Sequence, residues 1–170
     1  VSFYAKGDVG TLTASLAKAG GGALASGQVE GLGSEWKKFE LVLQTDAGLQ
    51  PSSDNVFKLT AIQPGKLWLQ QVSVFGPGFK DRPGGLRPDL MALMAAMKPK
   101  FLRFPGGNYL EGDSFAQRFD WKKTLGDPAR RPGHRAPWNY WSSDGMGLME
   151  FLLWCEDLGM EPLLGVFAGY

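Results

Sequence analysis

The hydrophobic pattern of this sequence changes its period near residue 75, and this change constrains the fold more than any other feature. Before it, short runs alternate apolar and polar side chains, at residues 12–16, 39–43, 57–61 and 67–74. Alternation of period two is typical of a strand with one buried face, and the glycine-rich stretches between the runs are typical of turns. No helical period competes in this region. The first part of the chain is therefore predicted to form an antiparallel β-sandwich.

Beyond residue 75 the pattern is that of helices alternating with buried strands. A helix is expected to begin at Pro88, which suits a first helical turn, and to end before Pro99. A strand is expected over 101–104, and a continuous apolar strand over 162–168, as in a parallel sheet with both faces covered. Because two strands cannot close a parallel sheet, its neighbours must come from further chain or from another molecule. We therefore expect the chain to be an internal fragment.

A second helix is expected between these two strands. Its N-cap is predicted to be Ser143 or Asp144, and Gly159 is predicted to end it. Cys155 falls on its apolar face and is expected to be an unreactive core residue. The stretch from Leu110 to this helix is predicted to be a long loop, and long loops in compact domains are usually functional.

Charge and composition exclude several classes of function. The chain of 170 residues carries 18 Lys and Arg against 17 Asp and Glu, a formal net charge of +1, which gives no electrostatic case for nucleic acid or a membrane surface as partner. Its longest apolar run, residues 90–97, is far shorter than the roughly 20 residues of a membrane span. One cysteine and one histidine exclude an internal disulfide and the usual zinc sites. No metal or organic cofactor is expected.

The turn after the first apolar strand is the best candidate for a ligand site. In βα proteins ligands bind at the carboxyl ends of the strands. Arg103 is a charged residue in that strand, and it either binds a ligand or pairs with a carboxylate. Gly106 and Gly107 either let a ligand approach the backbone or simply form a tight turn. Asn108 either hydrogen-bonds a sugar hydroxyl or caps the turn.

The loop that follows holds six aromatic residues, which either line a cleft that binds sugar faces or form a small core that holds the loop down. They are Phe115, Phe119, Trp121, Trp138, Tyr140 and Trp141, and the small core is favoured for most of them. His134 lies in the basic stretch 130–135, and we expect a solvated loop there rather than a phosphate site. Six carboxylates of this half have no convincing catalytic placement, namely Glu111, Asp113, Glu150, Glu156, Asp157 and Glu161.

Several motifs together resemble glycoside hydrolase family 51, and in particular its α-L-arabinofuranosidases that carry an inserted carbohydrate-binding-like sandwich. The motifs are FLRFPGGN (101–108), LEG (110–112), RPG (131–133), SDGMGL (143–148), WCEDLGMEP (154–162) and AGY (168–170). The stretch 67–87 also resembles the join between sandwich and barrel in that group. The likeness covers 67–170 well, whereas over 1–66 it depends on the strand pattern.

The resemblance implies a carbohydrate-binding-like β-sandwich over 1–76, a galactose-binding-like jelly roll, followed over 77–170 by the early βα units of an incomplete (β/α)8 TIM barrel. It implies a retaining, exo-acting α-L-arabinofuranosidase that releases terminal arabinofuranosyl residues from arabinoxylan, arabinan or arabino-oligosaccharides. It assigns Arg103 and Asn108 to the −1 sugar subsite, together with a tryptophan, Trp138 or alternatively Trp141. It also implies an extracellular or periplasmic location.

The two glutamates that perform the chemistry in this family have no counterpart in the sequence. The resemblance places both the acid/base and the nucleophile beyond Tyr170, and a substrate-binding glutamate before Val1. Since a retaining mechanism needs two carboxyl groups about 5 Å apart, the 170-residue piece is predicted to be inactive alone.

Three alternatives stay open at this stage. The chain could be a carbohydrate-binding module without hydrolytic activity, which binds glycan through Trp36 or Trp68. It could belong to a different barrel glycosidase, such as one resembling endoglucanases. A non-enzymatic structural domain is the third, and the glycine-rich loop at the strand end argues against it.

Overall fold

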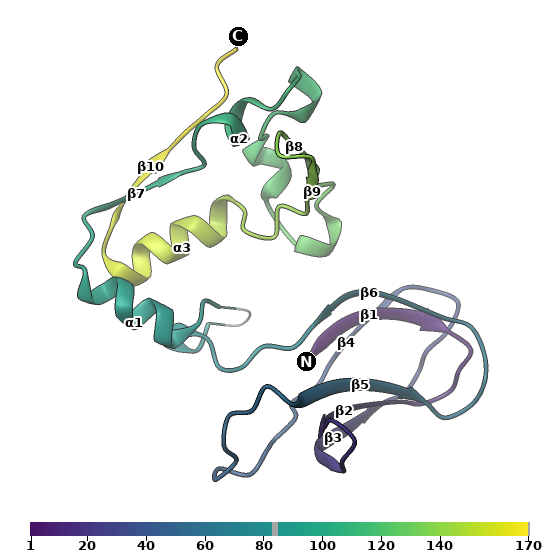
Figure 1. Cartoon of the computed structure of the whole chain (residues 1–170). Helices are drawn as coiled ribbons and strands as arrows, with labels where there is room; N and C mark the ends of the chain where they lie inside the picture. Colours follow the sequence, from purple (N-terminus) through teal and green to yellow (C-terminus); the bar gives the residue numbers. More distant parts are fainter. Residues whose placement is uncertain (83–84, 170) are drawn as a thin grey trace. The chain divides into compact units, whose positions relative to one another are not determined.

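The computed structural model describes residues 1–82 and 85–169, and it divides into two compact units (Figure 1). The first unit is Val1–Phe75 and the second Gly76–Tyr170, and each is described by itself. Tyr170, the last residue of the AGY motif, lies outside the described residues. No helix within the described ranges is both long and apolar enough to cross a membrane.

The first unit consists of two three-stranded antiparallel sheets. Its strands are β1 (Ser2–Gly7), β2 (Leu12–Lys18), β3 (Ala23–Val29), β4 (Lys37–Glu40), β5 (Asn55–Ala61) and β6 (Leu67–Ser73). One sheet has the order β4-β1-β6 and the other the order β3-β2-β5. The strands β2, β5 and β6 arise in three of the four runs where alternation predicts them, whereas β4 shares only its last two residues with the predicted run 39–43 and ends at Glu40.

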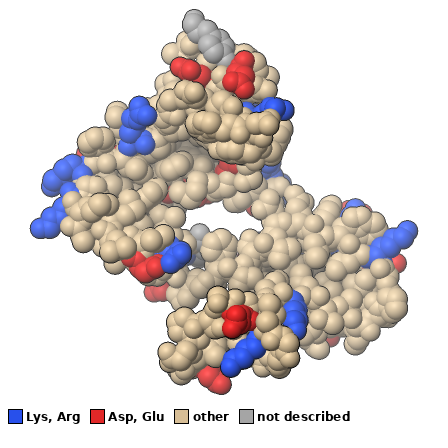
Figure 2. Space-filling view, viewed as in Figure 1, with Lys and Arg blue, Asp and Glu red and all other residues tan. Residues whose placement is uncertain are grey.

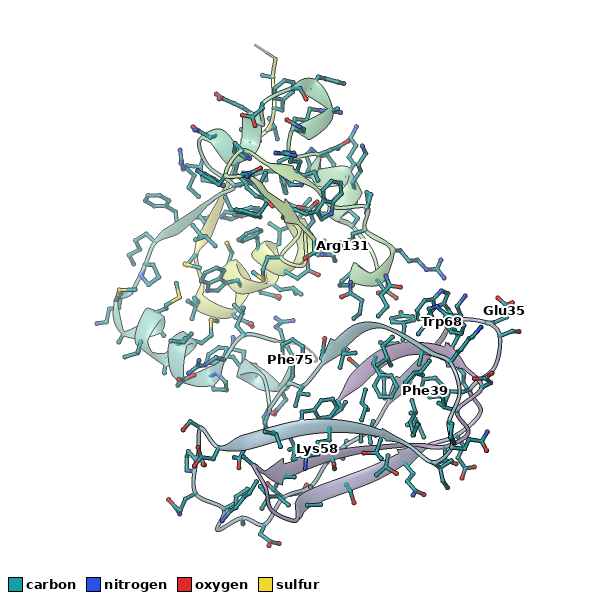
Figure 3. All side chains as sticks on the ribbon, turned by 45° about the vertical axis from the view of Figure 1, so that its right-hand side comes forward. Glu35, Phe39, Lys58, Trp68, Phe75 and Arg131 are labelled. Atoms are coloured by element: carbon teal, nitrogen blue, oxygen red, sulfur yellow. The ribbon has the colours of Figure 1, made fainter. Side chains whose placement is uncertain are left out.

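Both sheets contribute to a single hydrophobic core. Phe3 of β1 and Leu12 of β2 are fully buried in it. The ring of Phe3 stacks on that of Phe39, with ring centroids 5.6 Å apart, and Phe39 points between the sheets (Figure 3). Large apolar residues at every second position thus fix which face of each strand is buried.

The strands β1 and β3 are not predicted from the sequence, because small residues occupy several of their inward positions. Ala5 of β1 is fully buried without giving a strong apolar signal. In β3, a Cβ on Gly27 would lie only 2.7 Å from the side chain of Leu41. Glycine is favoured at this position because the neighbouring chain packs so closely that it leaves no room for a side chain.

The second unit is built around the parallel pair β7 (Phe101–Phe104) and β10 (Glu161–Leu164), with α3 (Leu148–Leu158) in the crossover between them (Figure 1). The helix α1 (Pro88–Ala96) precedes β7, as predicted. Phe151 of α3 stacks on Phe104 of β7 at a centroid distance of 4.5 Å. Cys155 is buried in the same cluster, which confirms its expected core role, and burial raises the pKa of its thiol.

The second strand is shorter than the predicted range of 162–168. Its pairing with β7 ends with the bond that the Gly165 N–H donates to the Phe104 carbonyl, at 2.8 Å. The partner strand β7 ends at Phe104, and Pro105 follows it. Val166 and Phe167 therefore continue beyond the paired strand.

The expected N-caps of α3 are wrong. The helix begins at Leu148 with Gly147 as N-cap, and the Gly147 N–H donates to the Glu150 carboxylate at 2.8 Å. Asp144 cannot cap the helix because its carboxylate is taken by other side chains. The C-terminal prediction is confirmed, since Gly159 adopts the left-handed conformation with φ 64°.

The predicted long loop is instead ordered by short elements. They are α2 (Asn108–Glu111), 3-10 turns over Phe115–Gln117, Trp121–Thr124 and Pro128–Arg130, and the antiparallel hairpin of β8 (His134–Ala136) and β9 (Tyr140–Ser142). A further 3-10 turn, Phe79–Asp81, precedes α1. Elements this short have no period that a sequence pattern could reveal.

Candidate functional site

Arg103 lies in β7 and its guanidinium covers the turn that follows the strand. The guanidinium lies so close to Gly106 that a Cβ at that position would collide with it. Gly107 has φ 55° and ψ −138°, a conformation that favours glycine. Among the described residues no hydrogen bond or ion pair engages the Arg103 side chain, so none of them is the carboxylate partner that the structural alternative requires. An unpaired guanidinium therefore stands at the end of a parallel strand.

Asn108 begins the short helix α2, and Tyr109 next to it connects this helix to the hairpin. The Tyr109 hydroxyl is 2.6 Å from Ser142 Oγ and donates a 3.0 Å hydrogen bond to Asp144 Oδ1. Burial, together with the negative charge of Asp144, raises the pKa of Tyr109 to about 12. Tyr109 thus keeps its proton and remains a hydrogen-bond donor throughout the physiological range.

Trp138 lies in the connection between β8 and β9, on top of Tyr109. The two rings are nearly parallel, at 17°, with centroids 6.0 Å apart, and Tyr140 stacks on Trp138 from its own strand at 6.2 Å. Trp138 still exposes 55% of its surface. Trp141 is 67% exposed, and its indole nitrogen lies against Gly133 instead. Trp138 is therefore the tryptophan that packs beside the residue following Asn108.

The expectation that His134 lies in a solvated loop is wrong. Its side chain is only 7% exposed, because alternation along β8 turns His134 and Ala136 inward. Its Nδ1 is 3.0 Å from Asp144 Oδ2, and its ring meets the Tyr109 ring edge-on at 5.0 Å. Sequence reasoning missed this pair, and the only available signal was the His-Arg-Ala alternation ahead of a turn.

Arg131, in the same basic stretch, is also buried (Figure 3). Its side chain is 2% exposed and donates to the Glu150 carboxylate at 2.7 and 3.1 Å. It donates as well to the carbonyls of Gly126 and Asp144, at 2.7 and 2.8 Å. Partial burial alone would raise the pKa of Glu150, but the bonds from Arg131 and the backbone outweigh it and hold this pKa below its usual value. Arg131 therefore fastens the loop to the start of α3.

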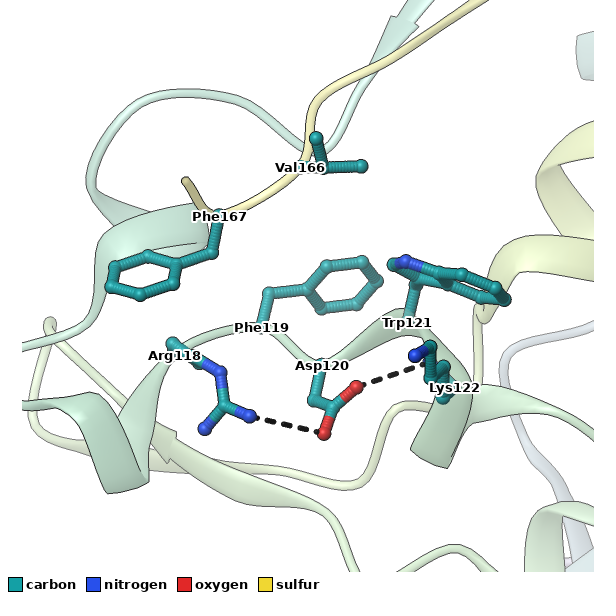
Figure 4. Close-up of a pocket in the computed structure, with 7 residues that line it drawn as sticks. All are labelled: Arg118, Phe119, Asp120, Trp121, Lys122, Val166 and Phe167. Atoms are coloured by element: carbon teal, nitrogen blue, oxygen red, sulfur yellow. Dashed lines mark hydrogen bonds and ion pairs between the residues drawn. The ribbon is translucent and has the colours of Figure 1, made fainter. Parts of the chain in front are cut away.

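An open pocket of about 210 Å³ lies beyond the carboxyl end of β10 (Figure 4). Its lining residues are Arg118, Phe119, Asp120, Trp121, Lys122, Val166 and Phe167. Arg118 pairs with Asp120 at 3.4 Å and stacks on Phe115 at 3.8 Å from the ring centroid. Phe119 is the one buried member of the six loop aromatics, whereas Phe115, Trp138, Tyr140 and Trp141 expose half or more of their surface, so the small core expected for most of them is wrong. The pocket combines aromatic walls with the Arg118–Asp120 ion pair and with Lys122, whose ammonium lies over the Trp121 ring.

The carboxylates on α3 are engaged in structural ion pairs. Glu156 pairs with Arg82 at 2.9 Å, and the buried Asp157 pairs with Arg82 and Lys80, which fastens the segment before α1 to α3. Among the described residues no group of three or more His, Cys, Asp or Glu is placed to hold a metal ion. On the face shown in Figure 2, acidic and basic side chains are interspersed within each unit.

Comparisons with known proteins find similar sequences and structures among the α-L-arabinofuranosidases. Residues 93–170 match the family model described as the Alpha-L-arabinofuranosidase 1 domain. Alpha-L-arabinofuranosidase A of Aspergillus kawachii is 50% identical over 99 residues, which are 58% of this chain and 16% of that protein. Alpha-L-arabinofuranosidase 1 of Arabidopsis thaliana is 40% identical over 131 residues, 76% of this chain and 19% of that protein.

A solved structure resembles the chain over nearly its whole length. This structure, an arabinose-bound family 51 α-L-arabinofuranosidase, aligns with a TM-score of 0.78 and 36% identity over 99% of this chain and 28% of that one. The resemblance to glycoside hydrolase family 51 is confirmed. The chain spans only 16% and 19% of the length of the two curated relatives named above. The stretch that matches the family model includes β7, α2, the hairpin and α3.

Proposed function

We propose that the protein is a retaining, exo-acting α-L-arabinofuranosidase that releases terminal arabinofuranosyl residues from arabinoxylan, arabinan or arabino-oligosaccharides. The observation that carries the proposal is the agreement in both sequence and structure, since α-L-arabinofuranosidases match at 50% identity and an arabinose-bound member of family 51 matches over 99% of the chain. Arabinose-containing plant polysaccharides or oligosaccharides are the partners that follow.

For the architecture, we infer a carbohydrate-binding-like sandwich of jelly-roll type over residues 1–76 and the first βα units of a (β/α)8 barrel over 77–170. Two antiparallel sheets with a shared core support the first assignment. The unit β7–α3–β10, in which a helix connects parallel strands, supports the second.

Within this enzyme, Arg103, Asn108 and Trp138 form part of the −1 subsite. The free guanidinium of Arg103 can donate to the hydroxyls of one arabinose ring, and the amide of Asn108 can both donate and accept. The exposed ring of Trp138 offers a flat apolar surface to the sugar. Stacking of Trp138 on Tyr109, next to Asn108, favours Trp138 over Trp141, which lies against Gly133.

The contribution of these residues is binding and orientation. A retaining glycosidase also needs an acid and a nucleophile about 5 Å apart, and the glutamates that the family uses have no counterpart in residues 1–170. Residues that hold the sugar ring in the reactive orientation can still supply a large part of the rate enhancement, because they convert a loose encounter into a fixed geometry.

The proposal is tested by the substrate preference of the full-length protein. We expect hydrolysis of an aryl α-L-arabinofuranoside at a kcat/KM at least about a hundredfold above that of the corresponding β-glucoside, since a site with fitted hydrogen bonds rejects sugars of another shape. Equal rates, or a preference for the glucoside, would favour the rival glycosidase of related fold.

A second function, glycan binding by the first unit, is favoured by a specific arrangement of side chains. Lys6 Nζ lies 5.3 Å from the Trp36 ring and 5.5 Å from the Trp68 ring. Lys6 and Trp68 face each other across β1 and β6, and the two indoles expose 44% and 48% of their surface. Binding of the full-length protein to arabinoxylan should weaken on Trp36→Ala or Trp68→Ala while hydrolysis of a small aryl arabinofuranoside is unchanged.

A further inference from the structure

Asp144 is a buried carboxylate for which the proposed sugar subsite has no direct use. Its side chain is only 4% exposed. Oδ1 accepts hydrogen bonds from the Tyr109 hydroxyl at 3.0 Å and from Ser142 Oγ at 3.3 Å. Oδ2 is 3.0 Å from His134 Nδ1. Both oxygens are therefore occupied, and neither is free to act on a substrate.

The three partners of Asp144 come from three different elements. Tyr109 belongs to α2, His134 to β8 and Ser142 to β9. The chain between α2 and the hairpin runs through irregular turns, so backbone pairing does not fix the position of one against the other. The Asp144 carboxylate, which contacts Tyr109, His134 and Ser142, connects α2 to the hairpin.

Through Tyr109, Asp144 is linked to two residues of the proposed sugar subsite. Tyr109 follows Asn108 in the chain, and the Tyr109 ring stacks on the ring of Trp138. Because hydrogen bonds to an ionised acceptor are shorter and stronger than neutral ones, Asp144 can hold the Tyr109 ring at one angle. The orientation of Trp138 then depends on a residue that never touches the sugar.

We propose that Asp144 is a positioning residue of the arabinose subsite, which acts through Tyr109 on the orientation of Trp138. This inference rests on the proposed arabinofuranosidase function. Another buried carboxylate of the second unit, Asp157, has different partners. Its side chain is 5% exposed and pairs with Arg82 and Lys80.

The test is a double-mutant cycle on the full-length protein, with the dissociation constant of free arabinose measured by calorimetry at a temperature where circular dichroism shows every variant folded. We expect Asp144→Ala and Trp138→Ala each to weaken arabinose binding about tenfold, and the double variant to lose clearly less than the product of the two losses, since residues that act through one another are not additive. A carboxylate with a purely structural role would lower the unfolding temperature and leave the dissociation constant of the folded protein unchanged.

If Asp144→Ala does not fold, two further variants test the same inference. Tyr109→Phe keeps the ring and removes only the hydroxyl link to Asp144, so it should weaken binding and couple to Trp138→Ala in the same way. Asp157→Asn, the matched control, should change the dissociation constant less than twofold. Unchanged binding in Tyr109→Phe, or an equal loss in Asp157→Asn, would overturn the inference. If the parent protein neither binds arabinose nor cleaves the arabinofuranoside, the proposed function itself fails, which is a separate outcome.

Discussion

Two arginines of the second unit show how one residue type serves two purposes at the residue scale. Arg131 is 2% exposed, and its donors are taken by Glu150 and by backbone carbonyls. Arg103 has no such partner among the described residues, and its guanidinium stands over the turn after β7. A buried hydrogen-bond donor without a partner is costly, so the buried guanidinium of Arg131 needs partners within the protein. The guanidinium of Arg103 is available to bind a ligand.

These environments predict that removal of the Arg103 side chain lowers activity, whereas removal of the Arg131 side chain lowers stability. Arg103→Ala should lower kcat/KM of the full-length protein for an aryl arabinofuranoside by about a hundredfold or more, because a charged hydrogen bond to the sugar is lost, and should leave the unfolding temperature nearly unchanged. Arg131→Ala should lower the free energy of unfolding by about 2–3 kcal/mol, as expected for lost hydrogen bonds to a charged group. Thermal melts and initial rates on both variants check this, and a large loss of stability in Arg103→Ala would contradict it.

The sequence identified Arg103 as a candidate site residue, but it did not reveal the burial of Arg131. A charge inside an apolar strand is a visible anomaly, so Arg103 could be selected by pattern alone. Arg131 sits in a run of basic residues that looks solvated, and its burial depends on Glu150, nineteen positions away. Pairings of that kind, like His134 with Asp144, arise from tertiary structure and leave no local pattern.

At the element scale, the turn between β7 and α2 is the part that sets the position of Arg103. Gly106 has no side chain, and the guanidinium occupies the space that a Cβ would need. Gly106→Ala should therefore push the guanidinium aside, at little cost in stability because the far end of a long side chain can move. We expect kcat/KM for the arabinofuranoside to fall about tenfold, as for small misplacements in a binding site, and the unfolding temperature to stay within a few degrees. Full activity in Gly106→Ala would show that Arg103 does not need this position.

The start of α3 gives a prediction on pH dependence. The pKa of Glu150 is lowered in the folded protein, through its bonds from Arg131 and the Gly147 N–H, against the opposing effect of partial burial. A carboxyl group whose pKa is lower in the folded than in the unfolded state contributes stability above the unfolded value of about 4.3, and this contribution is lost as the pH falls through the folded pKa. The free energy of unfolding, measured with urea between neutral and acidic pH, should fall less on acidification in Glu150→Gln than in the unsubstituted protein. Equal pH dependence in both would contradict this.

At the scale of the whole molecule, the sequence predicted the order of the elements better than their ends. Strands with large alternating side chains, such as β2 and β5, were found, while β1 and β3 were missed because alanine and glycine fill inward positions. The parallel pairing of β7 with β10 follows from an intervening helix, and it is present. The hairpin was missed because β8 and β9 have only three residues each, and the N-cap of α3 was missed because it is a glycine whose N–H bonds the Glu150 carboxylate.

The distribution of carboxylates over the molecule predicts what residues 1–170 do alone. Glu150, Glu156 and Asp157 are committed to arginine partners, and Asp144 to Tyr109, Ser142 and His134. Since retention requires an acid and a nucleophile about 5 Å apart, the purified segment 1–170 should not cleave an aryl arabinofuranoside above the background of the assay, under conditions where the full-length protein does. The same segment with Arg103→Ala serves as control for a contaminating glycosidase. Turnover that the segment shows and its Arg103→Ala variant lacks would mean that the segment itself holds a catalytic pair, and the assignment of binding without chemistry to these residues would be wrong.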